Sequence, residues 1–284
     1  MVIHTVDNFQ GKYINTQEGI YKMALPSFRR LLETKELSVG IFICEFTTPG
    51  IGQIIKAAGC DFAFVDMEHA ALGYETVKHT LRCVHDAGVA SLVRPPSKHY
   101  HHISRACDVG AQGIIPPMLS TAEEARNIVR YMKYPPLGER GVALGIAHDD
   151  YRSGAIDEKF ADANEKTCLV ALIETAEGIE NVEEIASVDG VDCLWIGHFD
   201  LSCSLGIPGQ FDHADFKRAV DRVVAAGIKY NKALGRLVPT VQQGVELFEK
   251  GFNMIVYSSD VRLLQQALAE GIERLRSQCR SVSK

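Results

Sequence analysis

The sequence has 284 residues, of which 46% are hydrophobic and 23% charged, a balance typical of a globular protein. Its net charge of −6 and the lack of a long basic block argue against nucleic acid as a partner. No run approaches the roughly 18 apolar residues that a membrane helix needs, and the first residues lack a signal-peptide core. The eight cysteines form no C-x-x-C pair, and several lie in apolar runs. These features predict a cytoplasmic protein in a reducing compartment, without a membrane partner.

The chain begins with a polar segment, residues 1–24, which shows no regular pattern. We expect it to be an irregular extension, or an arm that reaches a neighbouring subunit. Residues 25–284 are expected to form one domain. Its first element is a helix within PSFRRLLETKEL, which carries apolar residues on one side.

Eight short apolar runs follow, and amphipathic helical patterns separate most of them. The runs are Val39–Phe46, Phe62–Glu68, Val89–Pro95, Gly113–Met118, Cys168–Glu174, Val191–Gly197, Ala233–Val238 and Phe252–Tyr257. Apolar strands that alternate with helices predict a parallel sheet covered on both faces. Eight of them predict an α/β fold of the (β/α)8 (TIM) barrel type. A doubly wound sheet is the alternative, but it rarely needs eight strands, and no glycine-rich phosphate-binding turn follows the first run.

One segment interrupts the alternation of strands and helices. It covers residues 135–167, between the fourth and fifth predicted strands, after the helix that follows the fourth. Segments of this length without a clear pattern are usually functional lids or disordered. We therefore expect a lid or a disordered loop here.

Polar residues lie where four of the predicted strands end. They are Asp66, Glu68 and His69 after the second strand, Arg94 after the third, Glu174 after the fifth and Asp200 after the sixth. Because the active sites of such barrels lie at the C-terminal ends of the strands, these residues would meet at one mouth. Each has a simpler explanation when taken alone: Asp200 as a helix cap, Arg94 as the partner of Asp66, His69 as an ordinary loop residue. Together they favour a functional site, because charged groups at the ends of buried strands are costly unless paired or bound to a metal.

The residue types suggest chemistry on a 2-oxo acid. Glu174 and Asp200 offer oxygen ligands that suit Mg²⁺ or Mn²⁺ more than zinc. Arg94 offers a planar fork for a substrate carboxylate. His69, with Asp66 three residues before it, offers an oriented base. A 2-oxo acid could bind the metal through its carboxylate and keto oxygens, and the metal would stabilise an enolate.

Schiff-base chemistry is the alternative route to such an enolate equivalent. It needs a lysine at the end of a strand, and none of the eight strands ends in lysine. Lys98 lies four residues past Arg94, and Lys229 and Lys232 precede the seventh strand. The metal route is therefore favoured.

Five segments together resemble the motifs of the HpcH/HpaI aldolase family. They are VDMEHA, LVRPP, GAQGIIPPM, LIETAEGIENVEEIASVDGVD and IGHFDLSCSLG, and the resemblance covers residues 39–260. It implies a class II, metal-dependent aldolase that cleaves a 4-hydroxy-2-oxo acid to pyruvate and an aldehyde, with Mg²⁺, Mn²⁺ or Co²⁺ as the cofactor. It also implies a barrel whose last helix is swapped between subunits, in a homo-hexamer built as a trimer of dimers.

The resemblance also assigns roles by motif. Glu174 and Asp200 would be the metal ligands, and Arg94 would bind the pyruvate carboxylate. Backbone N–H groups near Gly197 and Phe199 would contact the pyruvate unit. In a further assignment, His69 would be the general base, acting through a metal-bound water, with Asp66 as its orienting partner.

The sequence departs from the family's motifs at several positions. Leu172 stands where many members have glutamine, and His198 stands where most have proline. His148 and Asp149 replace the usual Arg-Ala before Tyr151 in the loop ERGVALGIAHDDY. Leu172 removes a polar group near the expected metal, and His198 adds a titratable group at the mouth.

Three other functions remain open from the sequence. The related macrophomate synthase branch decarboxylates oxaloacetate to an enolate, so an oxaloacetate decarboxylase or enolate-addition enzyme is the nearest alternative. A CoA-ester lyase would need a cluster of basic residues for the nucleotide phosphates, which the sequence lacks. A non-catalytic oligomer that binds a keto acid would keep the metal site and lose turnover.

Overall fold

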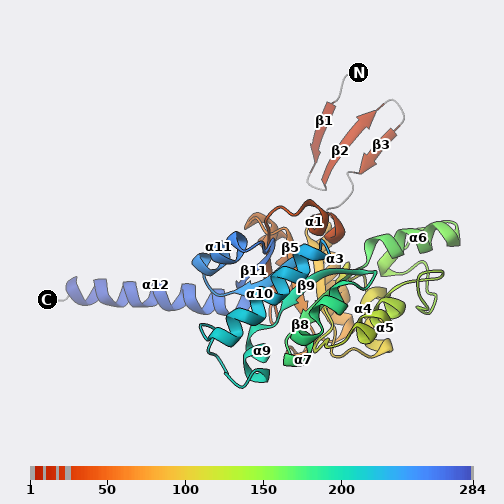
Figure 1. Cartoon of the computed structure of the whole chain (residues 1–284). Helices are drawn as coiled ribbons and strands as arrows, with labels where there is room; N and C mark the ends of the chain where they lie inside the picture. The colour runs from red at the N-terminus through yellow and green to blue at the C-terminus, as the bar shows by residue number, and fades with distance from the viewer. Residues whose placement is uncertain (1–3, 9–10, 17–18, 23–26, 283–284) are drawn as a thin grey trace.

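The computed structural model describes residues 4–8, 11–16, 19–22 and 27–282, and its main body is a closed barrel of eight parallel strands (Figure 1). The strands are β4 (Ser38–Ile43), β5 (Phe62–Asp66), β6 (Ala90–Arg94), β7 (Gly113–Ile114), β8 (Cys168–Ile173), β9 (Val191–Ile196), β10 (Ala233–Val238) and β11 (Met254–Ser259). Each strand pairs in parallel with the next, and β11 closes the barrel onto β4. The predicted (β/α)8 barrel is confirmed.

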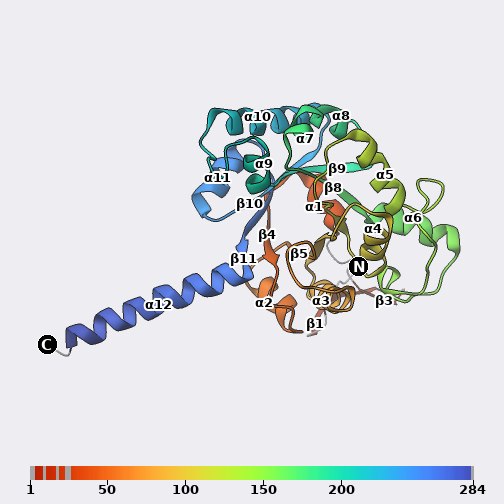
Figure 2. The ribbon, with the colours of Figure 1, turned by 90° about the horizontal axis from the view of Figure 1, so that it is seen from below.

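Helices precede the barrel strands, surround the barrel and, at the C-terminus of the chain, extend away from it (Figure 2). They are α1 (Phe28–Thr34), α2 (Ile51–Ala57), α3 (Tyr74–Asp86), α4 (Tyr100–Asp108), α5 (Ala122–Met132), the 3₁₀ turn η1 (Ala147–Asp149), α6 (Ile156–Lys166), α7 (Ala176–Glu180), α8 (Val182–Ala186), α9 (His198–Ser204), α10 (Ala214–Lys229), α11 (Val241–Glu249) and α12 (Asp260–Val282). None of the helices in the described ranges is both long and apolar enough to cross a membrane.

The N-terminal segment was expected to be irregular, and this is wrong for its described part. It forms a three-stranded antiparallel sheet of β1 (His4–Asn8), β2 (Gly11–Thr16) and β3 (Gly19–Lys22). Figure 1 shows this sheet beyond α1, apart from the barrel. The strands are too short and too polar to show the apolar alternation on which the sequence argument relied.

The inside of the barrel is filled with apolar side chains. Phe64, Leu92, Val170, Leu172 and Trp195 pack there in one buried cluster. The residues between them on the same strands point outward and pack beneath the helices. This alternation decides which residues at the strand ends face the axis of the barrel.

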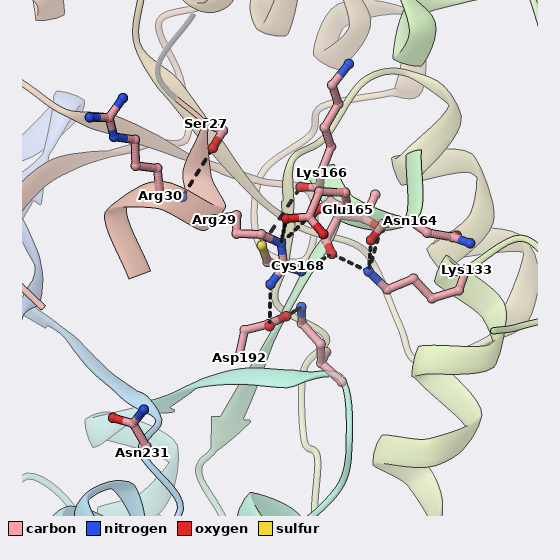
Figure 3. Close-up of polar contacts among 12 residues, drawn as sticks. Ser27, Arg29, Arg30, Lys133, Asn164, Glu165, Lys166, Cys168, Asp192 and Asn231 are labelled. Carbon is pink, nitrogen blue, oxygen red and sulfur yellow. Dashed lines mark hydrogen bonds and ion pairs between the residues drawn. The ribbon is translucent and has the colours of Figure 1, made fainter. Parts of the chain in front are cut away.

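Helix α1 closes the N-terminal end of the barrel. Phe28 and Leu32 belong to the same buried cluster as the inward-facing strand residues, and the Phe28 and Phe62 rings meet edge to face at 5.7 Å. Arg29 joins α1 to the barrel. Its Nη1 donates to Asp192 Oδ1 of β9 at 3.1 Å (Figure 3). Its Nη2 donates to the carbonyl of Thr167, just before β8, at 3.1 Å. The N-terminal end of the barrel is therefore plugged.

The segment 135–167 is neither a structureless loop nor a lid over the mouth of its own barrel. It contains η1 and α6, and it connects α5 to the start of β8, so it lies at the N-terminal end. Ion pairs hold it there: Arg140 with Asp108 at 2.5 Å, and Asp150 with Arg82 at 3.1 Å. The expected disordered loop is wrong, and so is a lid over this barrel's own mouth, because ion pairs to α3 and α4 order a segment that has little periodicity.

Strand β7 and helix α12 differ from the predicted pattern. Strand β7 ends at Ile114, shortly before Pro116 and Pro117, which have no N–H to donate to a neighbouring strand. Helix α12 leaves the barrel after β11 and extends away from it in both views (Figures 1 and 2). Its apolar residues are exposed in the single chain.

Candidate active site

The charged residues converge because strand side chains alternate. In β5, β6 and β8, the inward positions that end in Phe64, Leu92 and Leu172 continue to a last inward residue at the C-terminal end. These last inward residues are Asp66, Arg94 and Glu174. Gly197 follows β9 in the same register, two residues after inward-facing Trp195. The mouth of the barrel is therefore lined by two carboxyl groups, one guanidinium and one glycine.

Asp66 and Arg94 form a buried ion pair. Arg94 Nε donates to Asp66 Oδ1 at 2.7 Å, and Arg94 Nη1 lies 3.1 Å from Glu68 Oε2. Asp66 is fully buried and Arg94 is 9% exposed. The guanidinium also lies over the rings of Phe42 and Phe64, each 5.7 Å away. These contacts fix its plane and leave the Nη2 side for another anion.

The structure gives His69 a different neighbour from the one expected. Asp66 Oδ2 accepts the backbone N–H of His69 at 3.1 Å, whereas the imidazole Nε2 lies 3.6 Å from Glu68 Oε2. The His69 side chain is 65% exposed. Asp66 therefore orients the loop that carries His69, and Glu68 is the carboxylate beside the ring.

Glu174 is buried and held by a backbone group. It is 2% exposed, and its Oε1 accepts the Met118 N–H at 2.7 Å. Burial raises the pKa of this carboxyl to about 7, and the nearby carboxylates of Asp200 and Glu68 add to the rise. The Met118 N–H and Arg94 act in the opposite direction. The mouth thus concentrates negative charge that a single guanidinium does not balance.

Gly197 lets the Glu174 carboxylate approach the start of α9. A Cβ at position 197 would lie 2.2 Å from Glu174 Oε2 and 2.7 Å from Glu174 Cβ, which no side chain tolerates. Gly197 is also the residue before the first turn of α9, which carries Asp200. The Asp200 side chain is exposed and makes no hydrogen bond or ion pair with residues 27–282. Gly197, not Asp200, is the N-cap of α9, so the helix-cap explanation for Asp200 is wrong.

The residues at the mouth fit a hard divalent cation. Glu174 and Asp200 supply carboxylate oxygens on facing segments, and their mutual repulsion would be relieved by positive charge. Within the described ranges, no three or more His, Cys, Asp or Glu side chains are grouped as a complete metal cage. Mg²⁺ keeps several waters and often binds through one or two carboxylates, so two protein ligands suit it.

Two residues of the mouth were not assigned a role from the sequence. Glu68 was noted after its strand, and its contacts to Arg94 and His69 make it part of the site. Met118 gave no signal because it acts through its backbone N–H rather than its side chain. Such contacts depend on how two loops fold against each other, and side-chain chemistry does not reveal them.

His198 was expected to add a titratable group at the mouth. It is 9% exposed and packs against the rings of Phe199 and Phe211 at 4.4 and 5.2 Å. Burial, with Arg236 nearby, lowers its pKa to about 4. The imidazole is therefore uncharged near neutral pH and serves as a packing group. Leu172 lies inside the barrel, 2% exposed, two residues before Glu174.

Comparison with known proteins agrees with the fold and the motifs. The model of the HpcH/HpaI aldolase/citrate lyase family matches residues 39–267. The chain is 35% identical over 257 residues to a hydroxypyruvate/pyruvate aldolase of Delftia acidovorans, covering 90% of this chain and 95% of that protein. It is 31% identical over 250 residues to a 2-keto-3-deoxy-L-rhamnonate aldolase of Klebsiella pneumoniae, covering 88% and 93% of the two chains.

Comparison with solved structures shows the same barrel fold. An HpcH/HpaI aldolase from Desulfitobacterium hafniense superposes with a TM-score of 0.84 at 32% identity, covering 88% of this chain and 96% of that one. Macrophomate synthase superposes with a TM-score of 0.81 at 22% identity, covering 91% of this chain and 93% of that one, a likeness of fold alone. The chain belongs to the HpcH/HpaI aldolase/citrate lyase family, and it is an enzyme of the aldolase (lyase) type.

Proposed function

We propose that this protein is a class II aldolase that cleaves a 4-hydroxy-2-oxo acid to pyruvate and an aldehyde. The observation that carries the proposal is the convergence of Glu174 and Asp200 beside Arg94 at the mouth of the barrel. The relatives named as aldolases of hydroxypyruvate/pyruvate and of 2-keto-3-deoxy-L-rhamnonate support a short 2-oxo acid as the substrate class.

Arg94 would hold the carboxylate of the pyruvate unit. Asp66 and Glu68 occupy its Nε and Nη1 side, so Nη2 can donate to a substrate oxygen without moving the guanidinium. The first N–H groups of α9, near Gly197 and Phe199, would donate to the same unit. A divalent cation held by Glu174 and Asp200 would supply positive charge for the enolate oxygen.

Cleavage needs a base at the 4-hydroxyl. Removal of that proton lets the C3–C4 bond break, with its electron pair moving to C3 to give the enolate and the aldehyde carbonyl. A proton returned to C3 then gives pyruvate. His69 is the proposed base because its ring is exposed at the mouth, and the carboxylate of Glu68 beside it would stabilise the protonated ring.

The test compares substrates and metals on one preparation. Metal-stripped protein would be assayed for pyruvate release from 4-hydroxy-2-oxo acids and from oxaloacetate, with and without Mg²⁺, Mn²⁺ or Co²⁺. We expect metal-dependent release from a hydroxy-oxo acid that Asp200→Asn abolishes, while Asp221→Asn, on the exposed side of α10, keeps it. Release from oxaloacetate alone would instead identify a decarboxylase. Binding of pyruvate with metal but without turnover of any substrate would identify a non-catalytic keto-acid-binding protein.

We also propose that the subunits exchange α12 within a homo-hexamer. An apolar cavity of about 720 Å³ lies outside β4, lined by Val39, Ile41, Ile51 and Ile55 among others. Leu263 and Leu264 at the start of α12 line one side of this cavity, and the rest of α12 extends away from it, so the outer side of the cavity is left open (Figure 2). The cavity and the exposed apolar stripe on α12 complement each other, which supports a second copy of α12 as the occupant.

A further inference from the structure

The backbone of Met118 is held in a left-handed conformation. Its φ is 56°, a region that a residue with a side chain seldom adopts. Both polar backbone groups of Met118 are occupied. Its N–H donates to Glu174 Oε1 at 2.7 Å, and its carbonyl accepts from Lys98 Nζ at 2.8 Å. The conformation of this one residue therefore links a lysine to the expected metal ligand.

Lys98 joins the loop after β6 to the loop after β7. Besides the Met118 carbonyl, its ammonium contacts the carboxylate of Glu124. Glu124 is the third residue of α5 and completes a capping box with Thr121, and its Oε2 also accepts the Ser120 N–H at 2.8 Å. The ammonium is thus fixed between a carbonyl and an anchored carboxylate.

A second contact ties the same loop to the strand of Glu174. Ser120 Oγ lies 2.8 Å from Oγ1 of Thr175, the residue after Glu174. The Ser120 carbonyl accepts from Asn181 Nδ2 at 2.9 Å. The loop after β7 is therefore held from two sides, by Lys98 on the β6 side and by these contacts on the β8 side.

From this geometry we propose that Lys98 is a positioning residue for Glu174. It holds the Met118 backbone in the conformation that directs the N–H at Oε1, so Oε2 faces Gly197 and the segment of Asp200. The inference rests on the proposed function, because it assigns the orientation of Glu174 to cation binding. It also gives this lysine a role other than Schiff-base chemistry, since its ammonium is engaged in an ion pair.

Residues that orient a metal ligand typically change metal affinity by about 10- to 100-fold when they are replaced. The same range is expected here for the loss of the Lys98 ammonium. Without it, the Ser120 hydroxyl, at 3.3 Å, would be the remaining side-chain donor to the Met118 carbonyl, and the contact from the Met118 N–H to Oε1 would weaken. The Glu174 carboxylate would then be less firmly oriented before a cation binds.

The test measures Mn²⁺ binding directly, by titration of metal-stripped protein followed by the electron paramagnetic resonance of free Mn²⁺. Lys98→Met is expected to raise the Kd about 10- to 100-fold, with the unfolding temperature little changed. Lys98→Arg should restore most of the affinity, because a guanidinium can donate to both the carbonyl and Glu124. Lys250→Met, at an exposed position after α11, is the matched control.

A second variant tests the same role independently, in case Lys98→Met does not fold. Glu124→Gln keeps the capping box, which accepts glutamine at this position, but removes the charge that holds Lys98. It should raise the Kd in the same direction by a smaller factor. A Kd within twofold of wild type in both variants would overturn the positioning role. Failure of the wild-type protein to bind Mn²⁺ at millimolar concentration would instead overturn the proposed function.

Discussion

The Glu174 carboxylate lies against Gly197, so closely that a methyl group at position 197 would come within 2.2 Å of Oε2. Gly197→Ala should therefore displace Glu174 and lower kcat/KM for pyruvate release at least tenfold, by the loss of ligand geometry. The comparison is with Gly244→Ala in α11, where a Cβ meets only ordinary contacts at 3.6 Å and beyond. Equal kcat/KM for the two variants would show that Glu174 is not part of the site.

Arg94→Lys keeps the positive charge but removes the planar guanidinium, which can donate two parallel hydrogen bonds to a carboxylate. A lysine cannot hold Asp66 and Glu68 and also present a second planar edge to a carboxylate, so we expect kcat/KM to fall roughly 100-fold, mainly through KM. Steady-state kinetics with a hydroxy-oxo acid would measure this. Arg222→Lys, an exposed arginine on α10, should leave both constants unchanged. An unchanged KM in Arg94→Lys would remove the assigned carboxylate contact.

His85 should make the protein sensitive to mild acid. Burial lowers its pKa to about 4, although Asp150 and Asp86 oppose the shift and Arg82 supports it. Its Nε2 lies 2.8 Å from Ser91 Oγ. The folded-state pKa is below the unfolded value, so the unfolding free energy is highest above about pH 6.5 and falls by a few kcal/mol, at most about 3, as the pH drops toward 4.

Denaturant titrations at several pH values would test this. His85→Gln keeps a hydrogen-bonding group for Ser91 but cannot be protonated, so its unfolding free energy should change less between pH 6.5 and 4. His79→Gln, an exposed position on the same helix, should behave like wild type. Parallel curves for His85→Gln and wild type would contradict the assignment.

Replacing Arg236 and replacing Arg140 with methionine should have different effects on the free energy of unfolding. Arg236 faces outward from β10 with its Nε buried and without a hydrogen-bond partner, and burial lowers its pKa to about 10. Its contact with the Phe216 ring at 5.4 Å offsets only part of that cost. Arg236→Met should leave the unfolding free energy unchanged or raise it by about 1 kcal/mol.

Arg140 is 2% exposed and pairs with Asp108 at 2.5 Å. Arg140→Met should lower the unfolding free energy by about 2 kcal/mol, because the partly exposed Asp108 loses its partner and the Tyr134 ring loses its contact with the guanidinium. Urea unfolding measures both variants. A marked loss of stability in Arg236→Met would contradict this prediction and show that the guanidinium makes a net favourable contribution where it lies.

The apolar stripe on α12 predicts self-association. Leu264, Leu268, Ile272 and Leu275 recur at helical spacing and are between 45% and 64% exposed in the single chain. Light scattering should give a mass of six times the 31.3 kDa chain. Leu268→Asp should reduce that mass, whereas Ser277→Asp, on the opposite face, should not. A wild-type protein of single-chain mass would contradict the exchange of α12.

The barrel and the convergence of its charges could be predicted from the sequence. The apolar runs marked eight strands, and the rule that barrel active sites lie at the C-terminal ends of the strands placed Asp66, Arg94 and Glu174 at one mouth. Loop geometry did not follow from the sequence. Whether the His69 ring meets Asp66 or Glu68 depends on the fold of a short turn, which has no repeating pattern. The same holds for Met118, whose contribution is a backbone N–H.

The N-terminal segment and the segment 135–167 show the other limit. The N-terminal strands pair with each other, so they need no apolar face directed at the barrel, and their sequence resembles a polar tail. The segment 135–167 is ordered by pairs such as Arg140–Asp108, which join residues far apart in the sequence. Composition cannot identify such partners.

The plug formed by α1 also has a kinetic consequence. With Phe28 and Leu32 filling the N-terminal end, the barrel has no rear exit, and every molecule must enter and leave past the exposed rim that carries Phe199. If Arg94 holds the inner fragment, the outer fragment departs first and the inner one last. The reverse reaction would then require the oxo acid to load before the aldehyde, so product-inhibition patterns should be those of an ordered mechanism.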